Sequence, residues 1–193
     1  MLKRRILAAA TLSMLLGFTA CQSTRDALQV GEAGERNPGP CPRAFALHDA
    51  SRIVNFHGSE SFSKVGFTAE ISNVKSLCRY FADRPIVADL EIEFDAGRGP
   101  SSEGDTHTYN MFVAVTRKNL AVIEKLEFPV TVRFPAGADR VSVKERVDRI
   151  EIPRINEGTS GENFEIIVGY VLTPEQRAFN ADGKRFRPSV GQN

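Results

Sequence analysis

Residues 86–95 read IVADLEIEFD, and this stretch decides the fold class of the chain. From Ala88 to Asp95, apolar residues alternate strictly with acidic ones. Successive side chains of a β-strand point to opposite faces of its sheet, so one face of this strand is apolar and the other carries only carboxylates. The pattern therefore predicts a strand with one buried face and one face in solvent.

Similar patterns precede and follow this strand. Asn73-Val74 is typical of a small turn between two strands, and Pro129 predicts an edge, a bulge or a break, because proline cannot donate to a ladder. The alternation shifts after Val147, which predicts a bulge. The further predicted strands are 43–48, 52–56, 65–72, 75–81, 109–116, 120–134, 141–152 and 164–172.

One helix is predicted near the end of the chain. Thr173 is a good N-cap, Pro174 suits the first helical position, and Gln176 completes a capping box, while residues 180–183 favour its end. We therefore expect an all-β domain at 41–181, an antiparallel β-sandwich that is immunoglobulin-like in the broad sense, with one short C-terminal helix. A small β-barrel is the alternative. The chain has no Trp, whereas a true immunoglobulin domain carries one in its core.

The N-terminus has the parts of an export signal. Lys3, Arg4 and Arg5 precede an uncharged, mostly apolar stretch at 6–20, which is shorter than the about 20 residues that span a bilayer. Residues 16–21, LGFTAC, resemble the lipobox of bacterial lipoproteins, with Phe18 where that family usually has Leu. The resemblance implies cleavage after residue 20 and a lipid on Cys21. Gln22, which is not Asp, implies sorting to the outer membrane. An inner-membrane lipoprotein and a soluble periplasmic protein are the alternatives.

The chain has three cysteines. If Cys21 carries lipid, Cys41 and Cys78 remain, and an oxidising periplasm favours a disulfide between them. A metal or redox pair would need closer spacing or further ligands. We expect residues 21–40 to form the lipidated N-terminus and a flexible tether. Residues 182–193, with Lys184, Arg185 and Arg187, are expected to form a flexible basic tail.

No catalytic or metal site is predicted, and no cofactor is expected. His48, His57 and His107 lack metal-ligand spacing, and although Ser59 and Ser61 lie near His57, no Gly-x-Ser-x-Gly motif is present.

The acidic row has two interpretations. Asp89, Glu91, Glu93 and Asp95 form either a calcium site or a solvated face, and the latter is favoured because carboxylates two residues apart are spaced too widely for a compact cage. Arg117, Lys118, Lys125 and Arg133 are the expected partners of that face. Two long loops, at 96–108 and 154–163, lie where binding usually resides on a rigid sandwich, but flexible connection is the favoured interpretation and no binding residue is assigned.

The expected function follows from the predicted export and localisation of the protein and from the lack of a catalytic motif in its sequence. The chain has 25 Lys+Arg and 24 Asp+Glu, and this balance does not favour nucleic-acid binding. The whole pattern resembles small envelope lipoproteins of Gram-negative bacteria. We expect a non-catalytic binding or scaffolding module, anchored through Cys21 at the periplasmic face of the outer membrane, with an envelope protein as partner. The alternative is a small-molecule or glycan carrier with an apolar pocket between the sheets.

Overall fold

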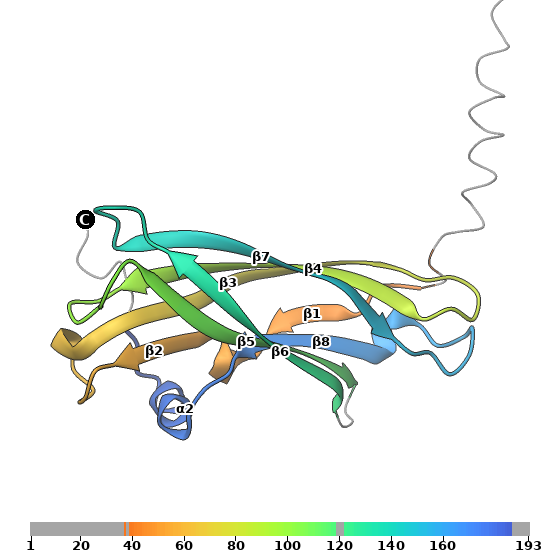
Figure 1. The fold of residues 1–193 in the computed structure, drawn as a ribbon. Helices are drawn as coiled ribbons and strands as arrows, with labels where there is room; N and C mark the ends of the chain where they lie inside the picture. Colours follow the sequence, from red (N-terminus) through yellow and green to blue (C-terminus); the bar gives the residue numbers. More distant parts are fainter. Residues whose placement is uncertain (1–36, 38, 119–121, 187–193) are drawn as a thin grey trace, which may run out of the picture. The chain divides into compact units, whose positions relative to one another are not determined.

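The structure is a computed structural model that describes residues 37, 39–118 and 122–186. The predicted signal peptide, Cys21 and most of the predicted tether lie outside the described residues. The described part is a β-sandwich, as predicted, with two four-stranded sheets and a short helix near its end (Figure 1).

The first sheet has the strand order β1-β8-β5-β6. Its strands are β1 (Arg43–Ala46), β8 (Phe164–Tyr170), β5 (Thr106–Arg117) and β6 (Val122–Arg133). Strand β1 runs parallel to β8, and the other neighbours are antiparallel. Pro129 lies opposite Asn110 within the edge strand β6, so the predicted edge position is confirmed and no break occurs there.

The second sheet has the strand order β2-β3-β4-β7. Its strands are β2 (Arg52–Phe56), β3 (Val65–Arg79), β4 (Ile86–Arg98) and β7 (Arg140–Ile152). The predicted turn at Asn73-Val74 is wrong, because β3 continues through this point with an irregularity of register between Ile71 and Asn73. A bulge absorbs one extra residue without ending the strand, so the local signal for a turn was misleading.

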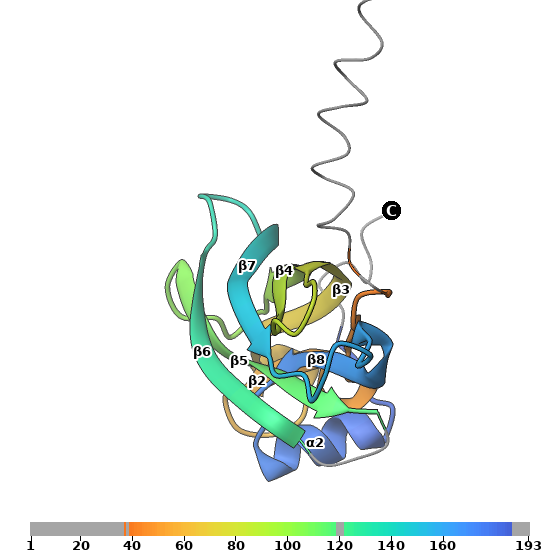
Figure 2. The ribbon, with the colours of Figure 1, turned by 90° about the vertical axis from the view of Figure 1, so that its right-hand side faces the viewer.

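The core fills the space between the two sheets. Ile86, Ala88, Leu90, Ile92, Phe94 and Ala96 of β4 are all buried, which confirms the predicted apolar face. They face buried side chains of β5 and β8, among them Tyr109, Met111, Ile166, Val168 and Tyr170. Figure 2 shows the two layers seen along the strands.

Helix α2 (Pro174–Ala181) begins as predicted. Thr173 and Gln176 form the reciprocal capping box, with Thr173 Oγ1 accepting from the Gln176 backbone N–H and Gln176 Oε1 accepting from the Thr173 N–H. Phe179 of the helix packs with Val54 and Val65, beside the edge strand β2. Phe186, within the predicted basic tail, packs against the Phe179 ring, so packed structure extends to this residue.

One end of the sandwich is closed by a disulfide. Cys41, just before β1, and Cys78, near the end of β3, are bonded with their Cα atoms 5.7 Å apart, so the predicted bridge joins the two sheets. Asn37 lies at the same end, where its side chain donates to the Cys78 carbonyl and accepts from the Tyr80 N–H. Asn37, within the region expected to be tether, thus makes ordered contacts with the domain. We call this the disulfide end.

Candidate functional site

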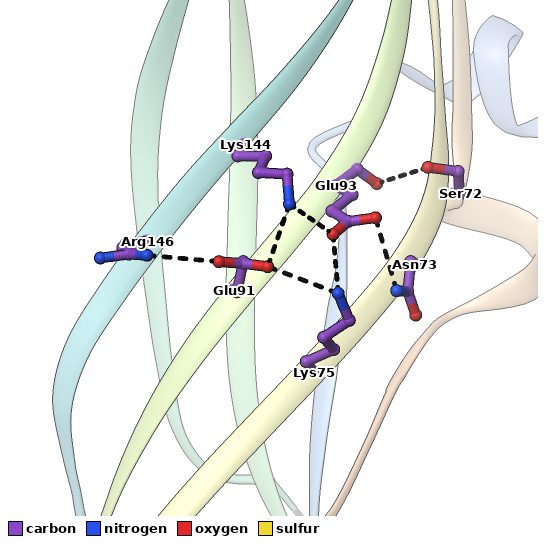
Figure 3. Close-up of polar contacts among 7 residues, drawn as sticks. All are labelled: Ser72, Asn73, Lys75, Glu91, Glu93, Lys144 and Arg146. Atoms are coloured by element: carbon purple, nitrogen blue, oxygen red, sulfur yellow. Dashed lines mark hydrogen bonds and ion pairs between the residues drawn. The ribbon is translucent and has the colours of Figure 1, made fainter.

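The outer face of the second sheet carries the predicted row of carboxylates on β4. Glu93 accepts from Lys75 Nζ of β3 at 2.8 Å and from Lys144 Nζ of β7 at 3.0 Å. Glu91 lies 3.4 Å from Arg146 and 3.5 Å from both lysines. Figure 3 shows the acidic side chains of the middle strand held between basic ones from both neighbours. We call these residues the charge ladder.

Within the charge ladder, every carboxylate is paired with basic side chains. Hydrogen bonds from Lys75 and Lys144 lower the pKa of Glu93 to about 2, so this carboxylate is ionised at any physiological pH. Farther along β4, Asp95 accepts from Ser142 and pairs with Arg140 at 2.7 Å. Each of these three carboxylates thus already has a basic partner on a neighbouring strand. This half of the face offers little unpaired charge to a ligand.

The prediction of a solvated, paired face is confirmed, but the predicted partners are wrong. Lys125 and Arg133 lie on β6 in the other sheet, where they pair with Glu127 and Asp105. Arg117 ends β5 in that same sheet, and Lys118 follows it. The sequence pattern does not encode which strands are neighbours, so the pairing with β3 and β7 could not be inferred. The metal interpretation has no structural support, since no cluster of three or more potential ligands occurs within the described ranges.

At the disulfide end, the same face is hollowed. A depression of about 590 Å³ lies over the ends of β3, β4 and β7 and the turn that joins β3 to β4. We call it the hollow. Its lining mixes apolar groups with three arginines and two carboxylates: Leu77, Cys78, Arg79, Tyr80, Phe81, Arg84, Pro85, Val87, Asp89, Arg149 and Glu151.

Two apolar side chains of the hollow, Leu77 and Val87, occupy outward strand positions at which the alternating pattern predicts polar residues. Leu77 is 78% exposed, the highest value among the large apolar residues of the described chain, and its neighbour Val87 is 36% exposed. Both have the outward parity of the charge ladder: Leu77 lies opposite Asp89, and Val87 lies opposite Arg79. Single exposed apolar residues are common, but a group lining one concave site is the usual mark of a binding surface.

The arginines of the hollow differ from the basic residues of the charge ladder. Arg79, Arg84 and Arg149 are all exposed, and within the described residues none has a carboxylate within 4.0 Å. Arg84 lies 4.4 Å from the centroid of the Phe81 ring. Asp89 instead accepts the backbone N–H of Arg149 at 2.8 Å. The hollow therefore combines free guanidinium groups with exposed apolar surface.

Arg149 reaches the hollow through a bulge. The register of β4 with β7 shifts between Ala88 and Leu90, which confirms the bulge predicted after Val147. Arg149 lies in this bulge with φ 57°, in the left-handed region that non-glycine residues avoid. Backbone strain of this kind is concentrated at functional sites. The strained position supports the choice of the hollow as the candidate site.

The wall of the hollow is fixed in place by Arg154. Its guanidinium donates to the carbonyls of Ala82 and Arg84 in the β3–β4 turn, at 2.7 and 3.0 Å, and to those of Glu157 and Thr159 in its own loop. It also stacks over Tyr80 at 4.8 Å. In Figure 1 this loop, between β7 and β8, lies beside the β3–β4 turn. The long loop at 154–163 thus supports the β3–β4 turn that lines the hollow.

Tyr80 ties the hollow to the first sheet. Its ring is buried at 1% exposure, and its hydroxyl donates to the Pro40 carbonyl and accepts from the Gly161 N–H. Together with the Cys41–Cys78 bridge, these contacts give the hollow a rigid floor. A rigid site keeps the entropy cost of binding low.

The other long loop, predicted at 96–108, is shorter than predicted. Strand β4 extends to Arg98, and β5 begins at Thr106. The loop is hydrogen bonded to β3 through Gly99 N–H to Gly66 O and Ser101 N–H to Val65 O. A Cβ at Gly99 would lie 2.2 Å from the Val65 carbonyl oxygen, so only glycine permits this close approach.

The three histidines are not brought together as a catalytic group. His48 contacts Asp49, its neighbour in the chain, at 2.9 Å in an exposed position. Ser61 contacts Ser63, and no serine hydroxyl in the described residues bonds a histidine ring nitrogen. His57 lies over Gly66, whose Cβ, if present, would be 2.7 Å from the His57 Nε2.

His107 is half-buried and held by an amide. Its ring stacks on Phe67 with centroids 4.3 Å apart, and its Nε2 lies 2.9 Å from Asn55 Nδ2. Asn55 Oδ1 accepts from Gln176 Nε2 at 2.8 Å, which fixes the amide so that its NH₂ points at His107. His107 Nε2 is therefore the acceptor, as in a neutral ring. Burial and the nearby His57 lower the pKa of His107.

Sequence reasoning missed the hollow, although a signal was present. Val87 and Leu77 are apolar residues on the polar parity of their strands, and each interrupts an otherwise charged or polar row. The arginines carried no pattern of their own, since Arg149 is about 65 residues from Arg84 in the sequence and reaches Arg79 and Arg84 only because β7 pairs with β4.

No protein-family model, curated protein or solved structure matches the chain. None of the helices in the described residues is both long and apolar enough to span a membrane.

Proposed function

We propose that this protein is a non-catalytic binding module of the bacterial envelope, anchored by a lipid on Cys21 to the periplasmic face of the outer membrane. The hollow at the disulfide end is its binding surface for an envelope protein. The observation that supports this most strongly is the contrast within one sheet face. The charge ladder is internally paired, whereas the hollow keeps unpaired arginines around exposed Leu77.

The fold suits such a role. The packed sandwich holds the hollow rigidly, and Asn37 contacts the domain next to the disulfide that borders the hollow. A tether that joins the domain at this end would present the hollow within reach of a membrane-associated partner.

The anchor is tested by the intact mass of the protein purified from membranes. We expect a chain that begins at Cys21 and carries the mass of lipid, and a Cys21→Ser variant released to the soluble periplasmic fraction. An unmodified N-terminal Cys21, or an unprocessed chain, would contradict the anchor.

The binding surface is tested by co-purification from detergent-solubilised cells with quantitative mass spectrometry. We expect a reproducible protein partner with the wild type that is lost with Leu77→Asp. The matched control is Ile123→Asp, since Ile123 is also an exposed apolar residue of a strand, 43% exposed, but lies on β6 of the other sheet. A partner that survives Leu77→Asp, or one that both variants lose equally, would contradict the assignment.

The carrier hypothesis predicts a different outcome for the same preparation. Organic extraction of the purified protein would then release a bound small molecule or glycan in stoichiometric amount. We favour the partner hypothesis because the hollow, of about 590 Å³, lies on the outside of a sheet and not between the two sheets.

A further inference from the structure

We infer that the ligand of the hollow is an acidic, aliphatic segment of a partner protein, a short peptide stretch in which carboxylate side chains alternate with Leu-like ones. This inference rests on the proposed function and names the chemistry of the partner. It follows from three features of the lining: the free guanidinium groups, the exposed apolar side chains and the shape of the site.

The guanidinium groups select the charge of the ligand. An Arg fork matches a carboxylate through two parallel N–H···O bonds, and such pairs are the stronger kind of hydrogen bond. Arg79 and Arg149 come from β3 and β7, the two neighbours of β4, so they lie on opposite sides of Val87 and Asp89. With no described carboxylate within 4.0 Å of either guanidinium, both can pair with an incoming acid.

The apolar side chains select the rest of the ligand. Leu77 lies two residues before Arg79 on β3, and Val87 lies opposite Arg79 on β4. Both line the hollow together with Phe81, whose ring is contacted by Arg84. Covering Leu77, which is 78% exposed, recovers hydrophobic free energy that a purely polar ligand cannot provide. An aliphatic side chain beside each carboxylate satisfies both parts of the lining.

The shape and the carboxylates of the hollow favour a peptide over a lipid surface. A bilayer is flat on this scale, whereas the hollow is a recess of about 590 Å³ that accepts protruding side chains. Asp89 and Glu151 also line it, and an anionic lipid surface would repel them. A peptide places its carboxylates at discrete positions, so it can reach the arginines while backbone N–H groups or solvent face Asp89 and Glu151.

The experiment titrates the mature full-length protein, in detergent micelles, with three acetylated and amidated hexapeptides by calorimetry. The probes are Glu-Leu-Glu-Leu-Glu-Leu, its neutral counterpart Gln-Leu-Gln-Leu-Gln-Leu, and Glu-Ser-Glu-Ser-Glu-Ser. We expect the first to bind at least tenfold more tightly than the other two, and more weakly as salt is raised. Equal binding of all three peptides, or no binding of the first, would overturn the inference.

Variants locate the binding. The double variant Arg79→Gln, Arg149→Gln should bind the Glu-Leu peptide at least tenfold more weakly than the wild type. The control Arg133→Gln should bind it with unchanged affinity. Arg133 is an exposed arginine on β6 of the other sheet, paired with Asp105. Thermal melting of each variant shows that it is folded. Loss of binding in the control, or unchanged binding in the double variant, would contradict the site.

A vesicle-binding experiment distinguishes an acidic peptide ligand from an anionic lipid headgroup. Together with the co-purification, it also distinguishes failure of the inference from failure of the proposed function. Vesicles of phosphatidylglycerol should bind the double arginine variant as well as the wild type. Arginine-dependent vesicle binding, with no peptide binding, would replace the peptide by a lipid headgroup. If no peptide binds and yet a partner dependent on Leu77 co-purifies from cells, the peptide chemistry is wrong and the proposed function stands.

Discussion

At the scale of single residues, the hollow depends on a few side chains in unusual positions. Leu77 and Val87 are apolar on the polar face of their strands, and Arg149 has a left-handed backbone. None of these choices stabilises the isolated domain in an evident way. Natural sequences break local rules chiefly at functional sites, so these residues support the proposal that the hollow is a binding surface.

Replacement of Arg149 by glycine should therefore separate stability from binding. Its φ of 57° costs a non-glycine residue about 1 kcal/mol, and glycine adopts this angle freely. We expect Arg149→Gly to raise the free energy of unfolding by about 1 kcal/mol in urea denaturation and to weaken the Glu-Leu peptide. Arg79→Gly, in a regular strand position, is the matched control and should lower stability. A destabilised Arg149→Gly protein would show that the side chain has a structural role.

His107 should make stability depend on pH. Burial and His57 hold the pKa of His107 below its ordinary value of 6.5, so below pH 6.5 the unfolded chain binds a proton that the folded chain resists. The stabilisation is complete above pH 6.5 and declines as the pH falls through this value. Protonation would also turn the acceptor of the Asn55 amide into a second donor.

The pH effect can be isolated by comparison of variants. The loss of unfolding free energy between pH 7.5 and pH 5.5 should be smaller in His107→Phe than in the wild type. An identical pH dependence in the wild type and His107→Phe would rule out a contribution from this ring.

At the scale of elements, β4 organises both halves of the outer face. Its inward residues are buried. Its outward residues Val87 and Asp89 line the hollow, whereas Glu91 and Glu93 belong to the charge ladder. The difference lies in which side chains of β3 and β7 are their neighbours. The switch occurs between Asp89 and Glu91. The same strand thus presents an open site at one end and a closed salt-bridge network at the other.

The charge ladder is tested by an NMR titration of the Glu93 carboxyl carbon. We expect a midpoint near pH 2 in the wild type, because Lys75 and Lys144 both donate to this carboxylate. Lys75→Met with Lys144→Met should return the midpoint toward 4.5, the ordinary value. The stability that ionised Glu93 contributes through its bonds with Lys75 and Lys144 is fully present above pH 4.5. It is lost as the pH falls toward 2. A wild-type midpoint near 4.5 would show that the network does not form in solution.

The strands were predictable to different degrees for physical reasons. The alternation at 86–95 and the Thr173–Gln176 box are local signals, and both elements form where predicted. The continuity of β3 through Asn73 was not predictable, since a bulge and a turn share the same local residues. The neighbours of β4 depend on contacts far apart in the sequence, so the partners of Glu91 and Glu93 were assigned wrongly.

At the scale of the whole molecule, the contacts that hold the parts of the fold together are concentrated at the disulfide end. Cys41–Cys78, Tyr80 and Arg154 join both sheets, the β3–β4 turn and the last long loop around the hollow. The chain enters the domain at this same end, through Asn37. The covalent bridge and the proposed binding surface therefore lie at the same end of the sandwich.

Removal of the disulfide should lower the stability of the protein without preventing it from folding. The bridge spans a sequence separation of 37, and closing a loop of this size in the unfolded chain is worth about 4 kcal/mol in the chain-entropy model. Cys41→Ala with Cys78→Ala should lower the unfolding free energy by about this amount in urea. Reductant should destabilise the wild type and leave the variant unchanged. A wild type that is insensitive to reductant would contradict the stabilising role of the bridge.

The most direct test of the central claim is site-specific photo-crosslinking in living cells. A photoreactive amino acid placed at position 77 should join the full-length, membrane-anchored protein to one reproducible partner, at a segment that contains Asp or Glu beside Leu, Ile or Val. The same amino acid at position 123, on the other sheet, should give no such adduct. Equal adducts from both positions, or none from position 77, would contradict the account of the hollow as the binding surface.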